Sequence, residues 1–497
     1  MSIADPIKVY DARWETEEFT VPEVRRLVEA TLRYGRMLDV DTVTISRDAR
    51  LGAGHVMEVA AEEAVRQGFR VFLCAEPIST PQSYHMALHV SQQHPNTMGL
   101  TITASHNPRQ YIGIKFTVPV VQAIGLDCGP EGGLRKIREF YHDGTPCKSR
   151  DGGSLELLDL TEDYIDFSLA AAGLAPGGLD GLAVLLDTFH GSAGPALFRG
   201  LRKAGARVET LRLVPDGNYP TGSPNPTSQG KMAAAIEACH DRGCHMLVGV
   251  DGDGDRLVFG DWRGVLTAGF SFVPILQQGG LSPDQPQPVL YDPKVNPLAL
   301  AEWARLGARP VLFRNGHSQI KDYMSRTGAI AAAEESGHYY HRLTLGEHTV
   351  STENSLMTVL MFARAVHRQS DLLNQLWSQQ KQVFTTGEFN YQFADDPTRD
   401  QAMATVIDHF QAGGAEVQTA TADGIDLQGT VLRRGVRIGE RSIDLEPGWF
   451  SGYLRIATNE RGVVRSYFSA ADTRSGERIE EQTRNILEQQ FSGQVIE

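Results

Sequence analysis

The chain contains 497 residues, a length typical of roughly three or four globular domains. Its formal net charge of -14 argues against a general nucleic-acid-binding protein, because such proteins usually carry a basic excess. No apolar run approaches the roughly 18 residues of a membrane-spanning helix, and the N-terminus lacks a signal-peptide pattern. The five cysteines are odd in number and form no Cys-x-x-Cys pair, so we expect no disulfide framework and no structural zinc site. These features predict a cytoplasmic protein with no nucleic-acid or membrane partner.

Helix-like and strand-like segments alternate through the first 150 residues. Apolar spacing predicts helices over 21–33 and 56–67, β-branched runs predict strands over 42–46, 69–74 and 101–104, and composition predicts turns at 47–50 and 79–81. This alternation predicts a largely parallel α/β sheet. Ligands bind beyond the carboxyl ends of the strands in such sheets. We therefore expect both turns, and the loop around Ser105, at the functional edge.

Two further α/β blocks and a fourth block of different character follow. The strands predicted in blocks two and three cover 182–187, 245–250, 289–292 and 310–313, and the helices cover 196–204, 230–242, 297–306 and 320–327. The fourth block contains short predicted strands at 436–438, 442–445, 452–456 and 463–468 and a closing helix at 476–490, an α+β pattern. The predicted domains are 1–150, 151–262, 263–375 and 376–497.

Residues 101–108 place a serine at the end of a strand. Ser105 is followed by His106, Asn107 and Pro108, which predicts a tight loop that presents the hydroxyl to a ligand or as a nucleophile. The alternative is an ordinary turn serine. A serine hydrolase is not indicated, because the chain has no Gly-x-Ser-x-Gly motif, and no Walker A motif is present either.

Asp251-Gly-Asp-Gly-Asp255 places three carboxylates at alternate positions directly after a predicted strand. The glycines let the loop curl so that the carboxylates converge on one hard cation, for which Mg2+ is the expected ion. A solvated acidic turn is the alternative, whereas an EF-hand is excluded because Arg256 and Trp262 occupy its glycine and glutamate positions. A serine combined with a metal loop suggests phosphoryl transfer.

Two weaker patterns complete the set. Glu334-Glu-Ser-Gly-His338 offers groups that can bind sugar hydroxyls and exchange a proton, although an exposed turn explains it equally well. Arg455-Ile-Ala-Thr-Asn459 follows a strand and offers an anion cradle, with a surface arginine as the alternative. Further candidate cations are Lys294, Arg314 and Lys321.

Taken in order, these motifs resemble the α-D-phosphohexomutase superfamily, most closely the bacterial phosphomannomutase/phosphoglucomutase group. The resemblance covers nearly the whole chain. The segments that carry it are Tyr10-Asp-Ala-Arg13, Thr103-Ala-Ser-His-Asn-Pro108, Tyr111-x-Gly-x-Lys115, Pro215-Asp-Gly, Pro224-Asn-Pro, Asp251–Arg256, Gly316-His-Ser-Gln-Ile-Lys321 and Glu334-x-Ser-Gly-His338. The resemblance implies three mixed-sheet α/β domains and a C-terminal α+β domain in a heart-shaped enzyme.

The resemblance also implies a mechanism and the roles of individual residues. Ser105 would carry a phosphoryl group, exchange it with a hexose phosphate through a 1,6-bisphosphosugar, and bind Mg2+ together with Asp251, Asp253 and Asp255. Hexose 1,6-bisphosphate would act as activator. The residues expected around the phosphoserine are His106, Arg13, Arg256 and Lys115, with Lys115 as a candidate proton carrier. His338 is expected as a catalytic residue near the sugar O1. The residues expected to bind the phosphosugar are Tyr10, Lys294, His317, Ser318, Glu334, Ser336, Arg455, Thr458 and Asn459.

The Arg455 loop departs from the pattern of this family. Ala457 stands where a serine is usual, and Arg461 replaces a proline. This departure motivates a competing hypothesis, a non-catalytic phosphosugar-binding relative. The motifs are also compatible with a phosphoglucosamine or N-acetylglucosamine phosphate mutase, and with a bisphosphate synthase or sugar phosphatase that uses the same serine. The leading hypothesis is a monomeric or homodimeric isomerase acting on mannose or glucose phosphates, with the choice between the two sugars left open.

Overall fold

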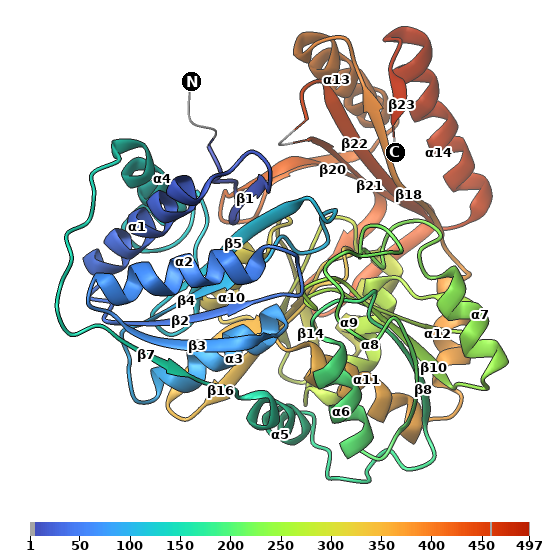
Figure 1. The fold of residues 1–497 in the computed structure, drawn as a ribbon. Coiled ribbons are helices and arrows are strands. Elements are labelled where there is room, and N and C mark those ends of the chain that lie inside the picture. Colours follow the sequence, from blue (N-terminus) through green and yellow to red (C-terminus); the bar gives the residue numbers. More distant parts are fainter. Residues whose placement is uncertain (1–4, 458–459, 497) are drawn as a thin grey trace. The chain divides into compact units, whose positions relative to one another are not determined.

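The computed structural model describes residues 5–457 and 460–496 (Figure 1). These residues divide into two compact units. Unit 1 contains the chain up to residue 265, together with 316–332 and 336–370. Unit 2 contains 266–315, 333–335 and the chain from 371 onward.

The first sheet of unit 1 is mixed. Its strands lie in the order β1 (Ala12–Glu15), β5 (Tyr111–Val118), β4 (Thr97–Ile102), β2 (Thr42–Arg47), β3 (Arg70–Pro77) and β7 (Ser154–Leu157), with β6 (Gln122–Ala123) paired to β5. Strands β4, β2, β3 and β7 are parallel, whereas β5 runs antiparallel to both β4 and β1. The carboxyl ends of β2, β3 and β4 therefore meet at one edge, as expected from the sequence.

Helices cover both faces of this sheet because side chains alternate along its strands. Val71 and Leu73 pack into the large core cluster with α1 (Val21–Met37), α2 (Ala53–Arg66) and α4 (Leu134–Asp143). Phe72 and Cys74 point to the opposite face and pack with Met86 on α3 (Thr80–Ser91). Figure 1 shows α3 on the side of the sheet opposite to α1 and α2. A 3-10 turn, η1 (Pro130–Gly132), precedes α4.

The second sheet of unit 1 lies in the order β12 (Gly264–Val265), β11 (Leu257–Asp261), β10 (Met246–Val250), β8 (Ala183–Asp187) and β9 (Arg207–Leu211). Strands β10, β8 and β9 are parallel, and every residue of β8 and β10 is buried. The accompanying helices are α5 (Thr161–Ala171), α6 (Gly194–Lys203) and α7 (Ala233–Asp241). Since β10 ends at Val250, it delivers Asp251 to the carboxyl edge of this sheet.

The remaining part of unit 1 comes from the third block. Its elements are α10 (His317–Thr327), β16 (Tyr339–Leu345), β17 (His348–Glu353) and α11 (Ser355–Arg368), and β15 (Ala331–Ala333) begins in it. Strands β16 and β17 form an antiparallel hairpin. Asn354 ends this hairpin and caps α11 by accepting a hydrogen bond from the backbone N–H of Met357.

Unit 2 combines α/β elements with an antiparallel sheet. Its first elements are α8 (Ala268–Gln278), β13 (Gln287–Tyr291), α9 (Pro297–Arg305), β14 (Ala308–Leu312) and α12 (Leu372–Gln380), with β13 and β14 parallel. The C-terminal sheet has the order β19 (Glu416–Ala420), β20 (Asp426–Ile438), β21 (Ile443–Ile456), β22 (Val463–Ala470), β18 (Phe384–Gln392) and β23 (Gln494–Ile496). It packs with α13 (Asp396–Ala412) and α14 (Thr473–Asn485), which continues into a π turn, η2 (Ile486–Gln490). Among the residues described, no helix is both long enough and apolar enough to cross a bilayer.

Two local predictions are wrong. The turn expected at 79–81 is the start of α3, because Ser79 and Gln82 form a capping box and Pro81 fits the first helical turn. The short strands at 442–445 and 452–456 belong to one strand, β21, and 436–438 is the end of the 13-residue β20. A β-bulge lies between Arg434 and Val436 and accommodates Gly435, which has a positive φ of 67°. In the sequence, a glycine at this position looks like the end of a strand.

Candidate functional site

Ser105 lies in the turn after β4, and its side chain faces the carboxylate loop. The residue is buried and adopts a left-handed backbone conformation with φ of 53°. Its Oγ lies 3.2 Å from Nδ1 of His106 and 3.3 Å from Oδ2 of Asp251. The fold thus brings the serine and the first aspartate together across a separation of 146 residues in the sequence.

Arg50 holds this turn in place, a role that the sequence did not reveal. The guanidinium is completely buried. Its Nη2 donates hydrogen bonds to the carbonyl oxygens of Ser105 and Asn107, each at 2.6 Å. Its Nη1 donates to the carbonyl oxygens of Pro108 at 2.9 Å and Tyr111 at 3.1 Å. The only available signal was the position of 47–50 at the end of a strand, which indicated the edge but gave Arg50 no function.

Asp48 links Arg50 to the other side of the turn. Its Oδ2 lies 3.2 Å from Nε of Arg50 and accepts a hydrogen bond of 2.7 Å from the Thr103 hydroxyl. The oxygen of that hydroxyl accepts the backbone N–H of Ser105 at 2.9 Å. The serine backbone is therefore fixed on its N–H side and on its carbonyl side by one buried network.

The carboxylate loop is shaped by its own backbone. Oδ1 of Asp251 accepts hydrogen bonds of 3.0 Å from the backbone N–H groups of Asp255 and Arg256, which closes the loop on itself. Gly254 has φ of 76°, and a Cβ at this position would lie 2.5 Å from Cβ of Ala193. Glycine is therefore required there, both by conformation and by space.

Lys115, which points from β5 into the loop, balances part of the negative charge. Its Nζ donates to Oδ2 of Asp253 at 2.7 Å and to Oδ2 of Asp255 at 2.5 Å. Burial disfavours the charged lysine, but attraction to the two aspartates outweighs it and raises the pKa of Lys115 well above its ordinary value. Thr80, at the start of α3, donates a further 2.6 Å hydrogen bond to Asp253 Oδ2.

The donor set fits a hard divalent cation. One carboxylate oxygen from each of Asp251, Asp253 and Asp255 lies within 4.8 Å of the others. Oδ1 of Asp253 and Oδ1 of Asp255 are buried and accept no hydrogen bond from the described residues. Buried carboxylate oxygens rarely lack a partner, and oxygen ligands of this kind are those that Mg2+ prefers. Together with the Ser105 oxygen, these residues are chemically suited to hold Mg2+.

His338 contacts both the carboxylate loop and a second buried acid. Its Nε2 accepts a 3.2 Å hydrogen bond from Nε of Arg256, and its Nδ1 lies 3.7 Å from Oδ1 of Asp255. The same Nδ1 lies 3.8 Å from Oε1 of Glu353, which forms an ion pair of 3.0 Å with Lys321. Burial lowers the pKa of His338 to about 3, so the ring is neutral near neutral pH. From the sequence, Lys321 was expected only as a general cation, and no pattern indicated Glu353.

Most of the other predicted residues of unit 1 lie in two groups. Arg13 is paired with Asp11 at 2.7 Å and donates to Oδ1 of Asn107 in the serine turn at 3.0 Å. Tyr10 and His317 form an edge-on ring contact with centroids 5.8 Å apart, and the Ser318 hydroxyl donates to the carbonyl oxygen of Tyr10 at 3.3 Å. Ser336 is half-buried in unit 1.

The predicted phosphate-binding cations of unit 2 share one carboxylate. Glu388 on β18 lies 3.3 Å from Nζ of Lys294, 4.0 Å from Arg455 and 3.0 Å from Arg465. Burial opposes the charge on Glu388, but these three cations outweigh it and lower its pKa to about 2. Glu334 is buried in unit 2. Two further predicted residues, Thr458 and Asn459, lie outside the described part of the chain.

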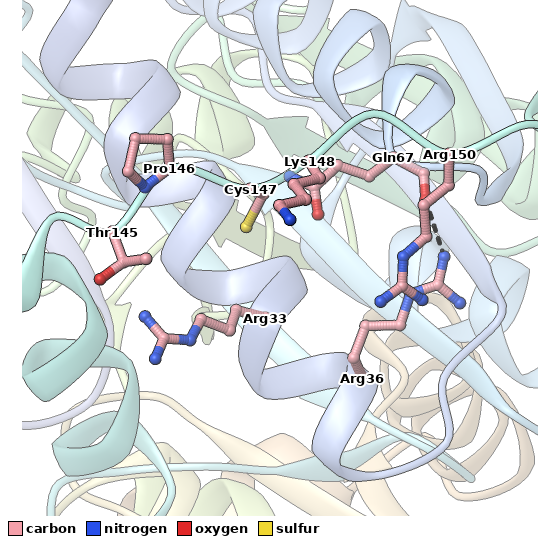
Figure 2. A pocket seen from close by; sticks show the side chains of 8 residues that line it. All are labelled: Arg33, Arg36, Gln67, Thr145, Pro146, Cys147, Lys148 and Arg150. Carbon is pink, nitrogen blue, oxygen red and sulfur yellow. Dashed lines mark hydrogen bonds between the residues drawn. The ribbon is translucent and has the colours of Figure 1, made fainter.

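A basic pocket of about 290 Å³ lies in unit 1 (Figure 2). Figure 2 shows Arg36 donating to the Gln67 carbonyl oxygen beside Arg150. The lining residues are Arg33, Arg36, Gln67, Thr145, Pro146, Cys147, Lys148 and Arg150. None of them belongs to the predicted site, so this pocket is separate from the serine turn and the carboxylate loop.

Comparison with known proteins gives consistent matches along the chain. Profiles of the phosphoglucomutase/phosphomannomutase alpha/beta/alpha domains I, II and III match residues 6–125, 162–264 and 273–383. The phosphomannomutase of Salmonella montevideo is 27% identical over 466 residues, which cover 92% of this chain and 95% of the relative. The phosphohexose mutases of Xanthomonas campestris pv. campestris (strain B100) are 27% identical over 460 residues, with 92% and 95% covered.

A solved structure of a phosphoglucomutase/phosphomannomutase family protein from Burkholderia thailandensis has the same fold, with a TM-score of 0.77, 23% identity and 98% of each chain covered. The predicted fold class is thereby confirmed, whereas the domain boundaries and the residue roles stay predictions. Because the three domain profiles match in order over most of the sequence, the chain belongs to the phosphoglucomutase/phosphomannomutase family of phosphotransferase mutases.

Proposed function

We propose that this protein interconverts the 1-phosphates and 6-phosphates of mannose, glucose or both, using Ser105 as the phosphoryl carrier and a 1,6-bisphosphosugar as the intermediate. The observation that carries the proposal is the 3.3 Å approach of the Ser105 hydroxyl to Asp251 at the edge of a three-carboxylate loop. A hydroxyl facing a cluster of carboxylates that suits Mg2+ favours phosphoryl transfer over acyl transfer.

The surroundings of Ser105 support the same reaction. Mg2+, when bound, would neutralise charge on the phosphoryl group, and the ligands would be Asp251, Asp253, Asp255 and the oxygen on Ser105. Arg13 reaches the serine turn through Asn107, and Lys115 lies against the carboxylate loop. A binding protein without catalysis would need neither the buried carboxylates nor a serine clamped from both sides.

The proposed reaction consists of two balanced phosphoryl transfers. First, the bond between phosphorus and Ser105 Oγ breaks while a bond to a free sugar hydroxyl forms, and the proton of that hydroxyl is released. The bisphosphate then turns end for end. Its other phosphate returns to Ser105, and the sugar oxygen that it leaves takes up a proton. Hexose 1,6-bisphosphate activates the enzyme because it can phosphorylate an empty Ser105.

The sugar and its distal phosphate are assigned to the remaining predicted residues. In unit 1, Tyr10, His317, Ser318 and Ser336 offer polar groups for sugar hydroxyls, and His338 would lie near O1. In unit 2, Glu334 would accept hydrogen bonds from sugar hydroxyls, while Lys294 and Arg455 would bind the distal phosphate. The name of the Salmonella relative supports mannose phosphate as one substrate.

A coupled mutase assay tests the proposal. Purified protein with Mg2+ and a bisphosphate primer should turn over mannose 1-phosphate, glucose 1-phosphate or both. Turnover of N-acetylglucosamine 1-phosphate alone would show that the substrate is an N-acetylglucosamine phosphate and not a mannose or glucose phosphate. Release of inorganic phosphate would indicate a phosphatase. No turnover of any of the three sugars would reject a mutase.

Intact-mass spectrometry tests the phosphoryl carrier separately. Protein treated with the bisphosphate should gain the mass of one phosphate, and Ser105→Ala should not. Ser91→Ala is the matched control, because Ser91 is a buried serine on α3 whose hydroxyl donates within its own helix to the carbonyl oxygen of Ala87. Phosphate retained in Ser105→Ala would overturn the assignment.

A further inference from the structure

A second group of metal-ligating side chains lies in unit 1, between α3 and α5. His85 and His89 are four residues apart on α3 and therefore lie on the same face of the helix. Asp163 comes from the first turn of α5. Its Oδ1 lies 2.6 Å from Nε2 of His85 and 3.3 Å from Nδ1 of His89.

The three ligand atoms are close enough to share one ion. One nitrogen from each histidine and one oxygen from Asp163 all lie within 4.8 Å of one another. Small rotations of the outer side chains would bring each atom to the roughly 2.0–2.2 Å of a metal bond. In the described residues, two other groups have comparable spacing, and both contain Asp255 of the carboxylate loop.

The environment combines a fixed inner ligand with an open side. The His85 side chain is 4% exposed and packs against the rings of Tyr164 and Phe167, with centroids 5.5 Å and 5.1 Å away. His89 and Asp163 are 40% and 46% exposed. An ion can thus enter from solvent, keep water in its remaining positions and find one imidazole already oriented. Burial also lowers the pKa of His85, which keeps the ring neutral and able to bind a metal.

We propose that His85, His89 and Asp163 form a second metal site, which binds Zn2+ or a similar transition-metal ion in preference to Mg2+. Two imidazole nitrogens and one carboxylate favour such ions, whereas Mg2+ prefers oxygen ligands only. On binding, the neutral His85 ring carries its proton on Nδ1 instead of sharing one between Nε2 and Asp163, and the Nε2 lone pair binds the ion. The bound ion joins α3 to α5 and so ties the first sheet of unit 1 to the segment that leads into the second.

Isothermal titration of the full chain with Zn2+ tests this site. Saturating Mg2+ is present throughout, so that the three-aspartate loop is occupied. We expect one Zn2+ per chain with micromolar or tighter affinity, and at least a tenfold weaker affinity in His89→Ala and in Asp163→Asn. Both changes are at half-exposed positions, where folding should be preserved. His240→Ala is the matched control, because His240 forms an exposed pair with Asp241 on α7.

Thermal unfolding supplies a second readout that does not depend on catalysis. Zn2+ should raise the unfolding temperature of the wild-type protein and of His240→Ala, and should raise it less in His89→Ala. Undiminished Zn2+ affinity in both His89→Ala and Asp163→Asn would overturn the proposal. An absence of Zn2+ binding by the Mg2+-saturated wild-type protein would also overturn it, and would leave a histidine–aspartate hydrogen bond as the only role of the cluster.

Discussion

Arg50 donates a 2.6 Å hydrogen bond to the carbonyl oxygen of Ser105, the residue proposed to carry the phosphoryl group. The same guanidinium binds three more carbonyl oxygens of the turn and contacts Asp48. An arginine can do this because its planar fork directs several donors at fixed angles, which a lysine ammonium cannot reproduce. The position of the serine therefore depends on a residue outside its own loop.

Arg50→Lys should lower kcat sharply while the protein still folds. Lysine keeps the charge beside Asp48 but loses most of the carbonyl contacts, and a displacement of about 1 Å at a reacting group can cost roughly 100-fold in rate. The coupled assay measures the change. Arg47→Lys is the control, because Arg47 donates to the backbone carbonyl oxygen of Asp48, whereas the Asp48 carboxylate makes the contact with Arg50. The kcat of this control should fall by less than about threefold. Equal losses of kcat in the two variants would contradict the proposal that Arg50 holds the serine turn in position.

Lys115→Met should destabilise the metal-free protein by about 3–5 kcal/mol, because it leaves buried carboxylates without a counter-charge. Mg2+ should recover part of this loss, since the cation supplies the missing positive charge. Denaturant unfolding with EDTA and with Mg2+ measures both quantities. In the control Arg212→Met, which removes the partner of buried Asp187, the loss should persist in Mg2+. Identical Mg2+ responses would show that Lys115 and the ion do not share the carboxylates.

Glu388→Gln should increase the affinity of unit 2 for anions. The carboxylate currently neutralises part of the charge on Lys294, Arg455 and Arg465, and glutamine would leave these cations available to phosphate. We expect the KM for sugar phosphates to fall by about tenfold, which corresponds to about 1.4 kcal/mol. The control Glu460→Gln, which removes a partner of Arg465 only, should change KM less. A higher KM in Glu388→Gln would mean that Glu388 orients the cations instead of competing with phosphate.

His341 should make the protein less stable in mild acid. Burial lowers its pKa from 6.5 to about 4, so the folded state holds it neutral while the unfolded chain binds a proton below pH 6.5. Its contribution to stability is complete above pH 6.5 and is lost as the pH falls toward 4. From pH 7.5 to pH 5 the loss attributable to this residue should be about 2 kcal/mol. His341→Gln, which can keep the contact with Thr358, should show a smaller loss over this interval in denaturant titrations.

The approach of Ser105 to the carboxylate loop was expected from the resemblance to the phosphohexomutase superfamily, because the two loops follow strands of different sheets and no local pattern pairs them. The strand, the serine and the glycine-spaced aspartates are all local patterns. The hydrogen bonds from Arg50 to the serine turn could not be predicted from the sequence. They depend on β2 lying beside β4 and on backbone carbonyl groups that any residue could supply. The pairing of Lys294 with Glu388 could not be predicted either, since Glu388 comes from β18, 94 residues further along the chain. Motifs of neighbouring residues could thus be predicted, whereas hydrogen-bond and ion-pair partners that are distant in the sequence could not.

The left-handed backbone at residue 105 has a consequence for which amino acid can serve there. Serine and threonine carry equivalent hydroxyls, and both accept phosphoryl groups. A side chain branched at Cβ, however, fits poorly where φ is 53°, because its second γ atom collides with the neighbouring peptide groups. The geometry of the turn, more than the chemistry of the hydroxyl, therefore selects serine over threonine, and Ser105→Thr is expected to distort the turn although it retains the reactive group.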